Sequence, residues 1–140
     1  MTPAITAKRL ASAAEVLIGT PFRLHGRDPL TGLDCIGLLG AAMARGGHPI
    51  TLPTGYPLRL RDLGQWLPDP ASIGFARARS ACRAGDVVLL QPGAAQVHLA
   101  IADRSGGWIH AHAALRRVVR DAALPAGTIT AHWRLRRTRK

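Results

Sequence analysis

The stretch Gly32-Leu33-Asp34-Cys35-Ile36-Gly37-Leu38-Leu39 places a cysteine at the junction of a loop and a helix. Residues 19–34 are rich in Gly, Pro, Thr and Asp, which is typical of a loop. Apolar residues then continue to Gly46-Gly47, which predicts a helix that begins near Cys35 and ends at these glycines. A thiol here lies at the positive end of the helix dipole, where backbone N–H groups favour a thiolate and can hold an oxyanion. The position also suits a small buried core residue.

Two more helices are expected around this junction. Between residues 4 and 18, apolar side chains recur at spacings of three and four, which predicts a helix that ends at Gly19. Residues 48–57 are rich in proline and indicate a loop, and residues 58–67 predict a short helix.

The second half of the chain changes to short apolar runs separated by turn residues. These runs predict strands over residues 86–91, 97–102, 108–113, 115–120 and 129–135. Helices followed by strands indicate an α+β fold, with the helices packed on one side of a small antiparallel sheet of about five strands. The chain has 140 residues and shows no linker of useful length, so we expect a single domain over residues 1–140.

Composition and charge limit the classes of function. Apolar residues are 47% of the chain, enough for a core, and no apolar stretch is long enough for a membrane span. The N-terminus lacks the apolar region of a signal peptide, so we expect a reducing compartment and free thiols at Cys35 and Cys82. The formal net charge of +11 favours an anionic partner such as nucleic acid, phospholipid or cell wall polymer. A GC-rich genome gives the same arginine bias, and since no nucleic-acid motif is present we expect no nucleic-acid partner.

Two histidines could serve the Cys35 thiol. His98 and His110 fall on consecutive predicted strands, and adjacent antiparallel strands can place two imidazoles side by side, one as base and one to orient it. A protonated His98 beside the helix N-terminus predicts a lowered pKa for Cys35. Either histidine alone also fits a half-buried polar residue on a strand. His112, on the same strand face as His110, is the alternative third residue.

The remaining histidines and cysteines suggest no further site. His25 and His48 fall on predicted loops, where we expect exposure, and His132 is expected on a strand surface. Cys82 is expected to pack. The cysteines lack zinc-site spacing, so no metal or other cofactor is expected. Core packing is expected for the three tryptophans, Trp66, Trp108 and Trp133.

Several segments of the chain form an ordered series. They are Gly19-Thr20-Pro21-Phe22, Leu33-Asp34-Cys35-Ile36-Gly37-Leu38, Ala84-Gly85-Asp86-Val87-Val88, Val97-His98-Leu99-Ala100-Ile101 and Trp108-Ile109-His110-Ala111. In order and spacing, from about residue 10 to about residue 120, the series resembles the successive motifs of the NlpC family, papain-like cysteine peptidases of the bacterial cell wall. The resemblance implies a papain-like fold and hydrolysis of the peptidoglycan stem peptide, typically at the bond between D-γ-glutamyl and meso-diaminopimelate.

The resemblance also implies roles for single residues. Carried over by motif, Cys35 is the nucleophile, His98 is the base and acid, and His110 is the third, orienting residue. Asp34 would line the site beside the nucleophile and contact the free amine of the stem peptide. Asp86 would be a structural turn or cap residue at the start of the first core strand.

The chain departs from the family pattern near the nucleophile. Phe22 stands where the family has a tyrosine, whose hydroxyl helps at the oxyanion or substrate site, and His25 or Arg23 could take its place. Ile36 stands where the family has a serine that contacts substrate, so the stem-peptide preference is open. These departures leave room for a catalytically weak or inactive structural tail component on the same fold. A papain-like amidase or acyltransferase is a further alternative.

Because neither a signal peptide nor an extra wall-binding domain is recognised, the chain resembles the phage-encoded, tail-associated branch of the family, including relatives in gene transfer agents. This implies synthesis in the cytoplasm without a signal peptide, incorporation in a phage-like tail beside tail proteins, and action on the periplasmic cell wall. The basic residues 134–140 are expected to be a frayed end, or a contact with anionic wall polymer or with a neighbouring tail protein.

Overall fold

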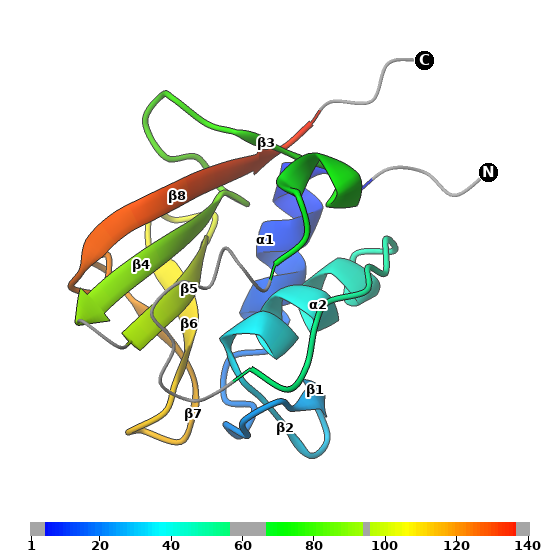
Figure 1. Ribbon diagram of the computed structural model, residues 1–140, viewed down its shortest axis with the longest axis vertical. Helices are drawn as coiled ribbons and strands as arrows, with labels where there is room; N and C mark the ends of the chain where they lie inside the picture. Colours follow the sequence, from blue (N-terminus) through cyan, green and yellow to red (C-terminus); the bar gives the residue numbers. More distant parts are fainter. Residues whose placement is uncertain (1–4, 57–66, 94–95, 137–140) are drawn as a thin grey trace.

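Two helices lie against one side of an antiparallel sheet in the computed structural model of the chain, which describes residues 5–56, 67–93 and 96–136 (Figure 1). Helix α1 spans Ala7–Val16 and helix α2 spans Cys35–Arg45. The two helices contact each other, α1 also contacts strand β5, and α2 packs against strands β5 and β6. The N-terminal end of α2 therefore meets the middle of the sheet.

Within the described residues, the main sheet has six strands in the order β3-β8-β4-β5-β6-β7, and every neighbouring pair is antiparallel. The strands are β3 (Phe75–Arg77), β4 (Val87–Gly93), β5 (Gln96–Ala102), β6 (Trp108–His112), β7 (Arg117–Asp121) and β8 (Thr128–Leu135). A separate two-stranded sheet pairs β1 (Arg27–Asp28) with β2 (Gly32–Leu33), and a short 3-10 helix, η2, spans Pro70–Ile73. Because β4 to β7 follow one another in sequence and in space, the two predicted histidine strands are neighbours.

Both helices begin at a polar side chain that caps them. The Thr6 hydroxyl accepts a hydrogen bond from the backbone N–H of Arg9 at 3.1 Å. A carboxylate oxygen of Asp34 accepts one from the backbone N–H of Gly37 at 2.8 Å. Such caps satisfy N–H groups that have no partner inside the helix. The cap at Asp34 therefore fixes where α2 begins and makes Cys35 its first residue.

The sheet buries apolar side chains on both faces. Along β4, Val87 and Leu89 belong to the main core cluster with the helices, whereas Val88 and Leu90 belong to a second cluster on the opposite face. This alternation follows from the two-residue period of a strand. Trp108 and Trp133 are buried as predicted, and Trp66 lies outside the described residues.

The α+β prediction is confirmed, and the five predicted strands correspond to β4 through β8. The sequence analysis missed β3, because three residues that pair with the end of β8 carry too little periodicity to be recognised. It missed β1 and β2 for the same reason. The helix predicted over residues 58–67 falls almost wholly outside the described residues, and the single domain over residues 1–140 stays a prediction. Within the described ranges, every helix is too short or too polar to cross a membrane.

Candidate active site

Cys35 lies at the point where α2 meets strand β5. It is half-buried and packs against the main core cluster. Hydrogen bonds from the backbone N–H groups of Leu99 and Ile36 reach its thiol. Leu99 follows His98 in β5, so the thiol lies beside the backbone of the strand that carries the predicted base. Backbone N–H groups from two elements thus converge on the predicted nucleophile.

The resting thiol is neutral. Burial raises the pKa of Cys35 to about 12, and the negative charge of Asp34 adds to the effect, while the backbone hydrogen bonds act against it. The sequence prediction of a lowered pKa is wrong here, because desolvation outweighs the helix N-terminus. A proton acceptor is therefore needed at the moment the thiol reacts.

Three side chains on neighbouring strands form a hydrogen-bonded line, here called the His–His–Asp row (His98, His110 and Asp121). Nε2 of His98 lies 2.6 Å from Nδ1 of His110, and the two rings meet edge to face at 83°. Nε2 of His110 lies 2.6 Å from a carboxylate oxygen of Asp121. The His110 side chain is 3% exposed and that of Asp121 is 52% exposed. The structure thus brings the two predicted histidines together.

Asp121 was missed by the sequence analysis. The predicted strand over residues 115–120 stops one residue short of it, whereas β7 continues through Asp121. In the register of β6 and β7, His110 lies opposite Val119 and Asp121 lies opposite Trp108, so Asp121 is a diagonal neighbour of His110. The alternation of side chains along each strand, combined with the register of β6 and β7, could have identified Asp121 as a neighbour of His110.

The His98 imidazole is neutral at neutral pH. Burial, together with the charges of His110 and His112, lowers the pKa of His98 to about 4. A neutral ring supplies no positive charge that could lower the thiol pKa, so the ion pair expected from the sequence is not present at rest. Among the described residues, no hydrogen bond joins the Cys35 thiol to His98.

His112 does not take the place of His110. Its ring centroid lies 5.7 Å from that of His110, and its Nδ1 accepts a hydrogen bond from the backbone N–H of Leu115 at 3.1 Å. His112 therefore faces the turn between β6 and β7, and His110 is the histidine in contact with His98.

Asp34 holds three segments around the start of α2. One carboxylate oxygen accepts from Arg27 at 3.0 Å and from the Gly37 backbone at 2.8 Å. The other accepts from the His25 backbone at 2.8 Å and from the Tyr56 hydroxyl. Asp34 is 3% exposed. A substrate amine would have to replace one of these donors, and the contact of Asp34 with substrate stays a prediction.

A close approach of backbone supports the same arrangement. A Cβ at Gly37 would collide with the carbonyl oxygen of Gly26, so only glycine allows this loop to lie against the first turn of α2. The Asp34 hydrogen bonds and this packing together hold the loop before Cys35 in one position.

The other predicted substrate residues are more buried than expected. His25 is half-buried rather than exposed, because its Nε2 contacts the Tyr56 carbonyl oxygen at 2.5 Å. Ile36 is fully buried in the main core, so its side chain offers no surface to a substrate in this structure. Phe22 is half-buried and pairs with Leu33, two residues before Cys35. Its contact with substrate stays a prediction.

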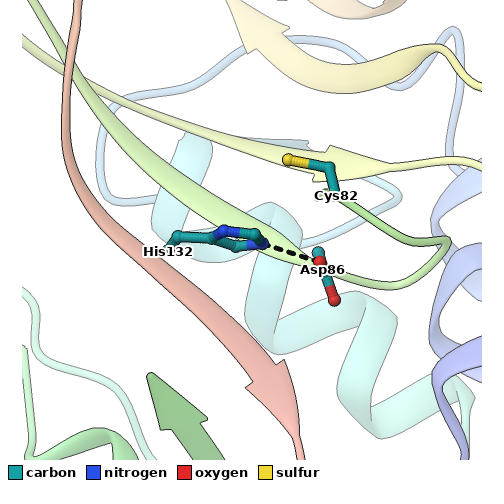
Figure 2. Close-up of side chains that lie close together, drawn as sticks. All are labelled: Cys82, Asp86 and His132. Atoms are coloured by element: carbon teal, nitrogen blue, oxygen red, sulfur yellow. Dashed lines mark hydrogen bonds and ion pairs between the residues drawn. The ribbon is translucent and has the colours of Figure 1, made fainter. Parts of the chain in front are cut away.

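A second group of potential ligand side chains lies near the start of β4, which Asp86 directly precedes. Figure 2 shows Cys82, Asp86 and His132 pointing toward one another, with one ligand atom from each within 4.8 Å of the others. Nε2 of His132 lies 2.6 Å from Asp86. Cys82 is exposed rather than packed, and His132 is half-buried rather than a surface residue, because it reaches the buried carboxylate.

The Asp86 carboxylate already has a full set of donors. Arg134 contacts both oxygens, at 2.9 and 2.8 Å, and the Arg83 backbone N–H donates at 2.9 Å. Burial raises the pKa of Asp86, but the hydrogen bonds from Arg134, the Arg83 backbone and His132 outweigh it and lower the pKa below its ordinary value. A metal ion would have to displace a guanidinium. We therefore interpret the group, here called the Asp86 cluster (Cys82, Asp86, His132 and Arg134), as structural, which agrees with the role predicted for Asp86.

Arg134 is consequently part of the fold rather than of a frayed end. It lies in β8, within the basic segment 134–140, and its guanidinium also donates to Ser80 and to the Ala81 carbonyl oxygen. Residues 137–140 lie outside the described residues. The expectation that no metal binds stays a prediction.

The comparisons with known proteins support the resemblance. The model of the NlpC/P60 family matches residues 19–134. No match was found among the curated proteins. The NlpC/p60 domain of the peptidoglycan hydrolase SagA is 26% identical, with a TM-score of 0.56, and the alignment covers 84% of this chain and 89% of that one.

Two more distant structures share the fold. NlpC1 from Trichomonas vaginalis is 18% identical, with a TM-score of 0.68 over 96% of this chain and 46% of that chain. The peptidoglycan hydrolase RipB from Mycobacterium tuberculosis is 21% identical, with a TM-score of 0.57 over 91% of this chain and 63% of that chain. The chain thus spans about half the length of the Trichomonas protein and less than two thirds of RipB.

Proposed function

The chain belongs to the NlpC/P60 family, and on this premise we propose that it is a cysteine peptidase that hydrolyses the stem peptide of peptidoglycan. Two structural neighbours, SagA and RipB, are peptidoglycan hydrolases by name. The bond proposed is the one between D-γ-glutamyl and meso-diaminopimelate. The observation that carries the proposal is the Cys35 thiol at the start of α2, beside the strand that presents His98 and its hydrogen-bonded partner His110.

The reaction proposed begins from a neutral thiol and a neutral imidazole. As the Cys35 sulfur attacks the scissile carbonyl carbon, His98 takes the thiol proton, so the sulfur becomes nucleophilic only in the transition state. The C=O bond becomes a C–O⁻ bond, and the backbone N–H groups that reach the resting thiol, such as that of Ile36, are the donors proposed for this oxyanion. His110 orients His98.

The second half of the reaction returns the proton. His98 protonates the departing amine as the C–N bond breaks, leaving a thioester on Cys35. A water molecule then attacks the thioester with His98 as base, and the acid product leaves as the thiol is reprotonated. No other reactant is consumed.

Digestion of purified muropeptides followed by mass spectrometry tests the proposal. Wild-type protein should give two products whose masses together equal that of the substrate plus one water, and the individual masses identify the bond that is cut. Cys35→Ala should abolish cleavage and leave the fold intact. Cys82→Ser, the matched control at the other cysteine, should remain active. Cleavage by Cys35→Ala would rule out the cysteine peptidase.

The same digestion separates the alternatives. Phe22, which lacks a hydroxyl, favours a weak or inactive structural tail component, and that protein would give little or no product from any muropeptide. A Phe22→Tyr variant with a higher turnover would show that the missing donor limits catalysis. An acyltransferase would give products with an added acceptor in place of water.

A location in a phage-like tail is proposed from the sequence resemblance alone. The protein would then be made in the cytoplasm, join tail proteins, and act on the periplasmic wall when the particle meets a cell. Purified particles should contain the chain, and antibody against it should label their tails in electron micrographs. Particles without the chain would remove this part of the proposal.

A further inference from the structure

We propose that Asp121 is a positioning residue: its carboxylate sets the protonation pattern of His110 and His98, so that Nδ1 of His98 is left able to accept the Cys35 thiol proton. The inference rests on the proposed function, in which His98 is the base. It concerns the one member of the His–His–Asp row to which neither the family motifs nor the sequence analysis gives a role.

The hydrogen-bond geometry determines which nitrogen carries each proton. A carboxylate only accepts hydrogen bonds, so Nε2 of His110, 2.6 Å from Asp121, must carry a hydrogen. A neutral imidazole has one N–H, and Nδ1 of His110 is therefore an acceptor. Nε2 of His98, 2.6 Å from that acceptor, must in turn donate. Nδ1 of neutral His98 is then unprotonated, as a base requires.

The fold holds Asp121 where this pattern needs it. Asp121 is the last residue of β7, and the next residue back, Arg120, donates to Asp103 at 2.5 Å. Asp103 also accepts from the backbone N–H of Gly107 at 2.7 Å, within the turn that joins β5 to β6. The end of β7 is thus tied to the turn between the two histidine strands, and from this position the carboxylate of Asp121 reaches His110.

The charge of Asp121 also suits the reaction. When His98 takes the thiol proton, the pair of imidazoles becomes positive, and a carboxylate in hydrogen-bond contact stabilises that charge. The titratable and charged side chains near the pair are His112 of β6, which acts on His98, Asp121 of β7, which contacts His110, and Arg117 of β7, which lies opposite His112. On the helix side, the charge of Asp34, the N-cap of α2, acts on Cys35. Both oxygens of Asp34 are engaged by other donors, which leaves Asp121 as the acidic group in direct contact with the pair.

Tautomers measured by nitrogen NMR on the labelled full chain test the assignment without any turnover. In the wild type, His98 and His110 should both be protonated at Nε2 when neutral. In Asp121→Asn, the side-chain amide can donate as well as accept, so Nε2 of His110 no longer has to carry a hydrogen. The Nε2-protonated fraction of both histidines should therefore fall. Unchanged tautomers in Asp121→Asn would overturn the proposal.

The kinetics provide the second arm. Asp121→Asn should lower kcat roughly ten- to a hundredfold with little change in KM, because proton transfer is affected and binding is not. Loss of the nearby anion should also make protonation of His98, the proposed base, less favourable, so the acid limb of the kcat/KM profile should move to lower pH. Asp121→Glu should restore part of the activity.

The experiment needs a control variant that loses the same charge elsewhere in the chain. Asp69→Asn removes the same charge at the N-cap of η2, where asparagine caps equally well, and should show wild-type kinetics. A fall in kcat of Asp121→Asn with an unmoved acid limb and unchanged tautomers would mean a purely structural role and overturn the proposal. Wild-type protein that cleaves no muropeptide would remove the proposed function, and the NMR arm would still decide whether Asp121 sets the tautomers.

Discussion

The chain gathers a cysteine, histidine and aspartate twice, and the surroundings of the carboxylate distinguish the two places. In the His–His–Asp row, the Asp121 side chain is 52% exposed and bonds to one imidazole. In the Asp86 cluster, the carboxylate is fully buried and is held by a guanidinium on both oxygens. The histidine lies 2.6 Å from its carboxylate in both.

A His–Asp contact therefore does not identify an active site by itself. Arg134 neutralises Asp86, so little of that negative charge remains to support an imidazolium on His132. Within the described part of the chain, Asp121 has no arginine ion pair, and its charge is available to His110. The predictions below test this distinction.

The largest difference is expected in stability. Asp86→Asn should lower the free energy of unfolding by about 3–4 kcal/mol, because it leaves a guanidinium and an imidazole around a buried neutral amide. Asp121→Asn, the same change at a half-exposed site, should cost less than about 1 kcal/mol. Urea denaturation at pH 7 measures both. Equal losses would mean that Asp121 is as structural as Asp86.

The two places should also respond to acid in different ranges of pH. His98 binds a proton at about pH 6.5 when unfolded but only at about pH 4 when folded, so unfolding is favoured as the pH falls between these values. Between pH 7 and pH 5 the wild type should lose about 2 kcal/mol through this residue, and His98→Gln should lose correspondingly less. The lowered pKa of Asp86 reduces the free energy of unfolding only once the pH falls below the pKa of the unfolded aspartate, about 3.9. Denaturation at pH 7, 5 and 3.5 separates the two.

The two thiols should differ in reactivity. Burial raises the pKa of Cys82 as it does that of Cys35, so both are neutral at pH 6 and exposure governs alkylation. Cys82 is exposed and should react with iodoacetamide roughly tenfold faster than half-buried Cys35. Peptide mapping by mass spectrometry gives both rates, with Cys82→Ser as the control. Faster labelling of Cys35 would show that an ion pair with His98 forms at rest.

The smallest effect is the change in Tm expected when zinc is added. Zinc should leave the Tm of the wild type unchanged, because binding at the Asp86 cluster requires Arg134 to leave the carboxylate. Arg134→Ala should free that carboxylate and make the Tm zinc-dependent. A zinc-dependent Tm in the wild type that Cys82→Ser removes would show a metal site where we infer a structural one.

The sequence predicts the parts of the fold that depend on local periodicity. The helix at Cys35 and the strands of the two histidines follow from it, and so does the meeting of His98 with His110, which needs only adjacent strands. Asp121 and Arg134 could not be predicted in the same way. Asp121 is a polar residue at a strand end whose partner depends on register, and Arg134 pairs with a carboxylate 48 positions earlier in the sequence. The pKa of Cys35 depends on burial, which no local pattern records.

The hydrogen bonds of Asp34 have a consequence for how the region around Cys35 moves. One carboxylate joins the loop at His25, the first turn of α2 and the segment at Tyr56. Losing any one of these contacts leaves a buried charge with fewer partners, so the three segments are coupled in free energy and should open together. Their amide hydrogens should then exchange with solvent at a common rate, as one cooperative unit, and a ligand that orders any one segment would slow exchange in all three.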